Sequence, residues 1–294
     1  MLLAAASAAG PCPAAPNPAG GAALPRVTAG FDPDPAREPD PAGDPDDELR
    51  NACADGDYAF VLASIRGETG AAIEAAERIT ELRPLHFAAG GGRPHVAAAL
   101  LFAGVAVDPR DTVQQTPLHH ACELGRADVV AVLLAHGADL HASGGIHHYT
   151  PLHLAVQNDH AALAATLLNA GADRDARERH GATPLHFAAL HGRAASVALL
   201  LDRGAAVNDP TTRDGYTALH LAAERDHVDV VRVLLDRGAD GSRTDRRGRT
   251  ALDLARARNA PAVARLLDGN DADTDADADT DAERPARSES RPHR

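Results

Sequence analysis

The stretch TPLHFAALHGRAASVALLLDRGA, residues 183–205, decides the fold because its pattern recurs along most of the chain. Related strings, RPLHFAA, TPLHHA, TPLHLA, TALHLA and TALDLA, begin at Arg83, Thr116, Thr150, Thr217 and Thr250. The distance between successive starts alternates between 33 and 34 residues. A fixed period of this length indicates repeats that stack on one another, because a single unit cannot bury its own apolar face.

Each string predicts a short helix. Threonine is a favoured helix N-cap residue, and proline suits the first helical position, where its missing N–H costs no hydrogen bond. After Thr116, the residues Leu118, Ala121 and Cys122 follow at i, i+3 and i+4 spacing, which places them on one buried stripe. The helix is expected to end at a glycine or a short polar residue, namely Gly125, Asp159, Gly192, Asp226 and Asn259 in successive units.

A second helix follows in each unit. Val129, Val132 and Leu133 repeat the i, i+3, i+4 pattern, and matching residues recur in later units. Gly137 then stands where a C-terminal cap belongs. A polar loop leads from there to the next threonine.

The combined pattern, G-x-T-P-L-H-x-A-A followed by V-V-x-x-L-L and G-A, resembles the ankyrin repeat over residues 83–268. The resemblance implies an all-α solenoid of stacked helix-turn-helix units, with short β-turn fingers in the loops and the first helices lining a concave face. It assigns residues 47–269 to an ankyrin-repeat domain, with clear units starting near 83, 116, 150, 183, 217 and 250.

The match has departures at its beginning and end. ELRNACADGDYAFVLASI, residues 48–65, looks like a degenerate first unit without Thr-Pro. Residues 66–82 do not fit the repeat, and GAAIEAAERITEL at 70–82 within them is either an extra helix or an expanded finger. Gln114 replaces the usual finger glycine, and Asp253 replaces the repeated histidine in the last unit, as suits a terminal cap.

The two ends of the chain show no periodicity. Residues 1–46 are rich in proline, alanine, glycine and aspartate, and residues 270–294 hold eight acids and four arginines. Such composition predicts disordered tails. Within 271–283, Ala276 and Ala282 stand where a calcium loop needs glycine and glutamate, so we expect no calcium site. The opening MLLAAASAAG lacks a basic start, so we expect no signal peptide.

Composition excludes several functions. The net charge is −13, which argues against nucleic acid as a partner. No run approaches the ~18 apolar residues of a membrane span. All 29 basic residues are arginine, so chemistry that needs a lysine amine is absent. Cys12, Cys53 and Cys122 are odd in number and irregularly spaced, which favours a reducing compartment.

The 16 histidines raise the question of a metal site. Five of them occupy one fixed position of the repeat, where the family resemblance implies a ring that braces the turn: His86, His119, His153, His186 and His220. His141, His147 and His148 cluster near one finger, but no nearby cysteine or carboxylate completes a set, so no metal is expected. No base, nucleophile and orienting partner occur together, so we expect neither an enzyme nor a cofactor.

The resemblance implies that partner contacts come from the finger tips and from the ends of the first helices. By register these positions hold Ile146, His147, Tyr149, Arg179, His180, Leu190, His191, Arg213, Tyr216, Arg225, Arg246, Arg247 and Arg249, with Arg258 on the adjoining helix. The set grades from apolar and aromatic to basic, which predicts a protein partner with an acidic patch. The two tyrosines are expected to be exposed and to contribute little to folding.

The sequence therefore predicts a monomeric, cytoplasmic adaptor that binds another protein and needs no cofactor. The alternative is a secreted or host-directed effector or inhibitor that uses the same surface. Because the acidic tail directly follows the basic last unit, a further hypothesis is that the tail masks the binding face.

Overall fold

The computed structural model describes residues 44–75 and 80–269. The predicted tail disorder, the signal peptide, the calcium loop and the masking hypothesis concern residues outside these ranges. Within them the regular structure is entirely helical, with fourteen helices and no strand, so the predicted all-α fold is confirmed. None of these helices is both long enough and apolar enough to cross a membrane.

The helices come in pairs along the chain. They are α1 (Pro45–Asp55), α2 (Tyr58–Ile65), α3 (Pro84–Gly91), α4 (Pro94–Phe102), α5 (Pro117–Glu123), α6 (Ala127–Ala135), α7 (Pro151–Gln157), α8 (Ala161–Asn169), α9 (Pro184–Leu190), α10 (Ala194–Asp202), α11 (Ala218–Glu224), α12 (Val228–Asp236), α13 (Ala251–Ala257) and α14 (Pro261–Leu267).

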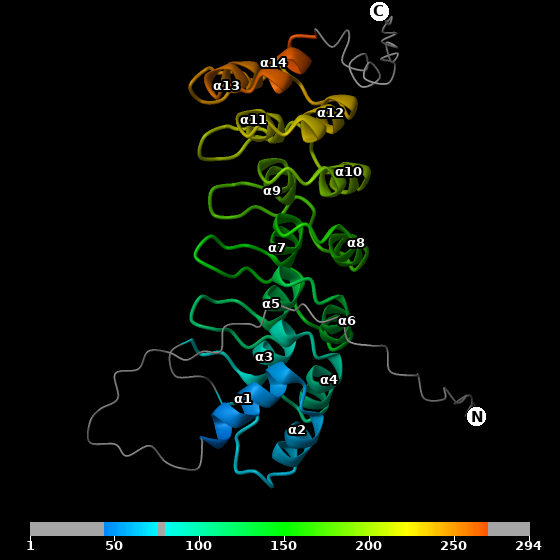
Figure 1. The fold of residues 1–294 in the computed structure, drawn as a ribbon. Coiled ribbons are helices and arrows are strands. Elements are labelled where there is room, and N and C mark those ends of the chain that lie inside the picture. Colours follow the sequence, from blue (N-terminus) through cyan, green and yellow to red (C-terminus); the bar gives the residue numbers. More distant parts are fainter. Residues whose placement is uncertain (1–43, 76–79, 270–294) are drawn as a thin grey trace, which may run out of the picture. The chain divides into compact units, whose positions relative to one another are not determined.

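The pairs stack in sequence order. The first helices contact one another in the series α1, α3, α5, α7, α9, α11 and α13, and each also packs on the second helix of its own pair. Figure 1 shows the loops projecting on the side of the first helices, with the second helices in the other column. The predicted solenoid of helix pairs is confirmed, and its contacts run between neighbouring units.

In the repeated strings before the last one, the leucine is buried in the core. Leu118, Leu152, Leu185 and Leu219 take the third position of successive strings, and each is at most 1% exposed. The small residues that follow them, such as Ala121, are also fully buried, which lets adjacent helices lie close together.

The short first helices end at the predicted glycine or polar residues, which adopt left-handed backbone. Gly125 and Gly192 have φ of 68° and 72°, and Asp159, Asp226 and Asn259 adopt φ between 57° and 65° in the other units. Aspartate and asparagine tolerate this conformation better than other residues with a side chain.

The first helix pair starts earlier than the composition suggests. Composition places Pro45 and Asp46 in the disordered tail, but α1 begins at Pro45. The side chain of Asp44 accepts the backbone N–H of Asp46, and proline suits the first helical position, so the helix extends to this cap. Between α2 and α3 the described residues form turns and contain no helix.

The repeated histidine fixes the start of each first helix. Its Nδ1 accepts the backbone N–H of the threonine three residues before it, at 3.1–3.2 Å in four successive units. The same nitrogen lies 2.9 Å from the threonine hydroxyl. The pair forms a capping box, which satisfies an N–H that the helix itself leaves unpaired.

The other ring nitrogen joins neighbouring units. Because Nδ1 accepts a hydrogen bond, Nε2 carries the proton of the neutral ring. His119 Nε2 lies 3.0 Å from the carbonyl oxygen of Tyr149, just before the next threonine, and the equivalent distances elsewhere are 3.1–3.3 Å. Burial lowers the pKa of His86, His119 and His153 to about 4, so the rings stay neutral.

In the last unit Asp253 caps the helix as the histidines do, but within the part of the chain that the structure describes it makes no contact with a following unit. Its Oδ2 accepts the backbone N–H and the hydroxyl of Thr250, at 2.9 and 2.8 Å. A carboxylate caps the helix without a second donor, and no further unit follows among the described residues to accept one. The expectation that aspartate suits the terminal position therefore has a specific physical reason.

A second series of contacts between units was not predicted. In five units the side chain of the residue before the second helix reaches back to a carbonyl near the end of the first helix of the preceding unit. Arg126 Nε donates to Gly90 at 3.1 Å, and His227 Nε2 lies 3.1 Å from the Leu190 carbonyl. Carbonyls at helix ends lack partners within the helix, so these side chains satisfy them.

Candidate functional site

The finger loops are closed by backbone hydrogen bonds. Five fingers precede successive threonines, at residues 111–115, 144–149, 178–182, 211–216 and 245–249. In each, the first residue donates its N–H to the carbonyl of the last, at 2.8–3.0 Å. The predicted short fingers are therefore present, and their tips project away from the helices (Figure 1).

Three fingers are braced by a buried acid that the sequence analysis missed. Asp111, Glu178 and Asp245 are at most 7% exposed, and one oxygen of each accepts two backbone N–H groups of its own finger. All three stand five residues before the repeated threonine, a periodicity that could have revealed them. Thr211 takes a related role, because its hydroxyl accepts the N–H of Tyr216.

The finger tips are joined to one another. The N–H of Gly145 donates to Val113 at 2.7 Å, that of Arg179 to His147 at 2.9 Å, and that of Arg246 to Asp214 at 3.0 Å, in each case to the carbonyl of the preceding finger. This ladder holds residues from separate repeats at fixed spacing along one edge of the stack.

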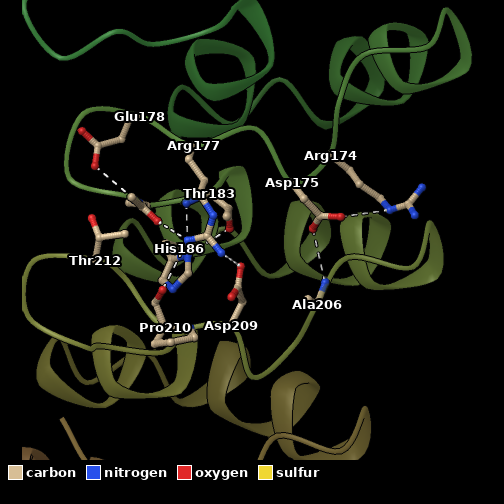
Figure 2. A network of polar contacts seen from close by, with 12 residues as sticks. Arg174, Asp175, Arg177, Glu178, Thr183, His186, Ala206, Asp209, Pro210 and Thr212 are labelled. Atoms are coloured by element: carbon tan, nitrogen blue, oxygen red, sulfur yellow. Dashed lines mark hydrogen bonds and ion pairs between the residues drawn. The ribbon is translucent and has the colours of Figure 1, made fainter.

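Side-chain contacts reinforce the ladder between the fingers 178–182 and 211–216. Figure 2 shows Arg177 reaching toward the next finger, where it forms an ion pair with Asp209 and donates to the Pro210 carbonyl at 3.3 Å. The hydroxyl of Thr212 donates back to the carbonyl of His180 at 2.7 Å. Arg177 therefore has a structural role in joining the two fingers.

The predicted partner-binding residues divide into two places. The finger tips carry Ile146, His147, Arg179, His180, Arg213, Arg246 and Arg247. Leu190, His191 and Arg225 lie at the ends of α9 and α11. Ile146 is 73% exposed, so one large apolar side chain faces solvent at the finger tips.

Three of the predicted residues are not free surface groups. Tyr149 packs edge-on against Phe187 with ring centroids 5.1 Å apart, and Tyr216 stacks on His220. Arg249 pairs with Asp245 and donates to the Tyr216 hydroxyl at 2.7 Å. The expectation that both tyrosines are exposed is wrong, because each ring packs against residues of the first helices and is half-buried.

The arginines of the predicted set differ sharply in their partners. Among the described residues, the side chains of five make neither an ion pair nor a hydrogen bond: Arg179, Arg213, Arg225, Arg246 and Arg247. Arg249 is tied to Asp245, and Arg258 to Glu224. The basic face is therefore made of finger-tip arginines and one helix end rather than of every arginine in the last unit.

Two consecutive fingers bring together three potential metal ligands, one of which is far from the other two in the sequence. His147, from one finger, lies with Glu178 and His180 of the next, and the ligand atoms that they offer are all within 4.8 Å of one another. The expectation that no carboxylate accompanies the histidine cluster is wrong, because Glu178 is supplied by the following repeat. His141 and His148 are not part of this group.

Comparisons with known proteins agree with this architecture. A family model described as ankyrin repeats in three copies matches residues 49–144 and 140–211, and one described as ankyrin repeats in many copies matches residues 208–255. The crystal structure of the human ASB11 ankyrin repeat domain is similar, with 32% identity, a TM-score of 0.67, and coverage of 81% of this chain and 100% of that one. No curated protein matches the chain.

The chain belongs to the ankyrin repeat family. Proteins of this family generally serve as protein–protein interaction modules, and the repeat is typically a non-catalytic scaffold.

Proposed function

We propose that this protein is a non-catalytic adaptor that binds an acidic segment of a partner protein. The binding surface consists of the finger tips and the adjoining ends of α9 and α11. The supporting observation is that the side chains of Arg179, Arg213, Arg225, Arg246 and Arg247 are unpaired within the described residues.

An unpaired arginine is suited to binding because no internal contact has to be broken. Arg177, Arg193 and Arg237 each already hold a carboxylate of a neighbouring repeat. The free guanidinium groups instead present their donors to solvent, and arginine pairs with carboxylates in a bidentate geometry. Ile146 adds an exposed apolar side chain on a finger nearer the N-terminus. The partner should therefore carry an apolar residue that contacts Ile146 and acidic residues that contact the arginines of the later fingers.

The proposed setting is the cytoplasm, with the protein acting as a monomer. Cys53 and Cys122 are buried free thiols, and burial raises the pKa of both. Neither takes part in a disulfide, so these two cysteines require no oxidising compartment.

The test is charge reversal on the finger tips. Arg179→Glu, Arg213→Glu and Arg246→Glu are combined in the full chain, and proteins cross-linked to it in cells are quantified by mass spectrometry. The control combines Arg66→Glu and Arg232→Glu, which change exposed arginines at the end of α2 and on α12, away from the fingers.

We expect the finger variant to lose the acidic partners that the wild type and the control retain. The same partners should be released by salt, since exposed ion pairs are screened. If the finger variant keeps the wild-type set and the control variant loses it, the partner binds the outer helices and the proposed surface is wrong.

A further inference from the structure

The group His147, Glu178 and His180 lies at the junction of two fingers and is not needed to explain the proposed binding of an acidic partner. Its three potential ligand atoms lie within 4.8 Å of one another and come from two consecutive repeats. We infer that this group is a binding site for a divalent transition metal ion, Zn²⁺ in the first place, which links the two fingers.

The backbone already holds the three residues in place. The N–H of Arg179, between Glu178 and His180 in sequence, donates to the carbonyl of His147 at 2.9 Å. This hydrogen bond fixes the separation of the two finger tips, so the ligands do not depend on a flexible approach. The rings of His147 and His180 lie with centroids 5.8 Å apart.

The carboxylate of Glu178 is held in place by its own finger. Its Oε1 accepts the N–H of His180 at 2.7 Å and that of Ala182 at 3.1 Å. A carboxylate offers about four acceptor positions, so these two bonds hold the group without exhausting it. Ordering of a ligand by surrounding hydrogen bonds is a regular feature of metal sites.

The ligand atoms need to move only a short distance toward one another to bind one ion. Tetrahedral zinc with bond lengths of about 2.0–2.1 Å brings its ligand atoms to roughly 3.3 Å from one another. We expect rotation of the two imidazole side chains to close this difference, because such a rotation leaves the backbone hydrogen bond between the fingers in place.

The donor set favours zinc over the harder cations. Two imidazole nitrogens and one carboxylate oxygen are ligands that Zn²⁺ prefers, whereas Ca²⁺ and Mg²⁺ require oxygen ligands throughout. Three protein ligands leave one position for water or for a side chain of a bound protein. One carboxylate and one bound ion leave the junction with a net positive charge, in keeping with the basic finger tips.

Binding is measured by isothermal titration of the full chain with ZnCl₂, in excess Mg²⁺ so that the carboxylates of residues 271–283 do not compete. The absorption spectrum with Co²⁺ in place of Zn²⁺ reports the coordination directly. The variants are His147→Ala, His180→Ala and Glu178→Gln, and the amide oxygen of the glutamine in the last variant keeps an acceptor for the two finger N–H groups. His141→Ala with His148→Ala is the matched control, because these histidines lie nearby but outside the group.

We expect one ion per chain, an affinity at least ten-fold weaker in each variant of the group, and wild-type affinity in the control. Circular dichroism checks that each variant remains folded. If an alanine variant does not fold, the conservative Glu178→Gln variant still tests the site. Equal affinity in the wild type and in Glu178→Gln, or a loss confined to the control, would overturn the site.

Discussion

The Nε2 atom of His119 lies 3.0 Å from the carbonyl oxygen of Tyr149, while Nδ1 of the same ring accepts the N–H of Thr116. One neutral imidazole therefore caps a helix in its own repeat and fastens the finger of the next. The same double contact recurs at four other histidines, so the ring is a recurrent polar link between consecutive units.

Replacing His119 by alanine should destabilise the protein by about 2–4 kcal/mol. The change removes the three polar contacts of the ring, with the N–H and the hydroxyl of Thr116 and with the Tyr149 carbonyl. It leaves the buried N–H of Thr116 unpaired, which alone costs about 1–3 kcal/mol. Urea unfolding measures the loss. His95→Ala is the control, because His95 is exposed and its substitution should change stability by less than about 0.5 kcal/mol. Equal stability of the two variants would show that the bridge contributes nothing.

Stability should fall as the pH is lowered from 6.5 toward 4. Burial lowers the folded-state pKa of His86, His119 and His153 to about 4, while the unfolded value is 6.5. The unfolded chain therefore binds more protons in this window, and the stabilisation is complete only above pH 6.5. At pH 5 the difference reaches about 2 kcal/mol for each histidine, from about 1.4 kcal/mol per pH unit.

Urea midpoints measured at a series of pH values between neutral and mildly acidic test this dependence. The free energy of unfolding should be nearly constant above about pH 7 and should drop steeply below about pH 6. A stability that stays flat into the acidic range would mean that the rings take up protons in the folded protein as readily as in the unfolded chain, and the assigned neutral tautomer would be wrong.

Leu185→Ala should cost about 2–5 kcal/mol, because Leu185 is 1% exposed and the substitution leaves a cavity between repeats. The loss should be local, since each unit contacts only its neighbours. Hydrogen exchange should increase first in α7, α9 and α11 and least in α1 and α2. Uniform loosening across all helices would show that the array unfolds as one cooperative unit instead.

The sequence was sufficient for the helix pairs because each is specified locally. Thr183 and Pro184 mark a helix start, and Gly192 marks its end, without reference to the rest of the chain. The contacts between fingers could not be predicted from the sequence, because they depend on distances between repeats. Glu178 lies close to His147 because the N–H of Arg179 bonds to the His147 carbonyl across the two fingers, and no pattern within one finger reveals which residue of the next finger lies opposite.

The same limitation explains why the sequence alone groups Arg249 with the binding arginines, and the structural difference between Arg249 and Arg247 gives the last prediction. Arg249 and Arg247 are two residues apart in one finger, but Arg249 holds Asp245 and the Tyr216 hydroxyl, while the side chain of Arg247 makes no such contact among the described residues. Arg247→Ala should therefore weaken partner binding and leave the melting temperature within about one degree, because an exposed, unpaired side chain contributes little to folding. Arg249→Ala should lower the melting temperature, because a buried carboxylate loses its charged partner. Thermal unfolding and partner affinity are measured on both variants. If Arg247→Ala lowers the melting temperature and Arg249→Ala does not, the assignment of structural and binding roles within this finger is reversed.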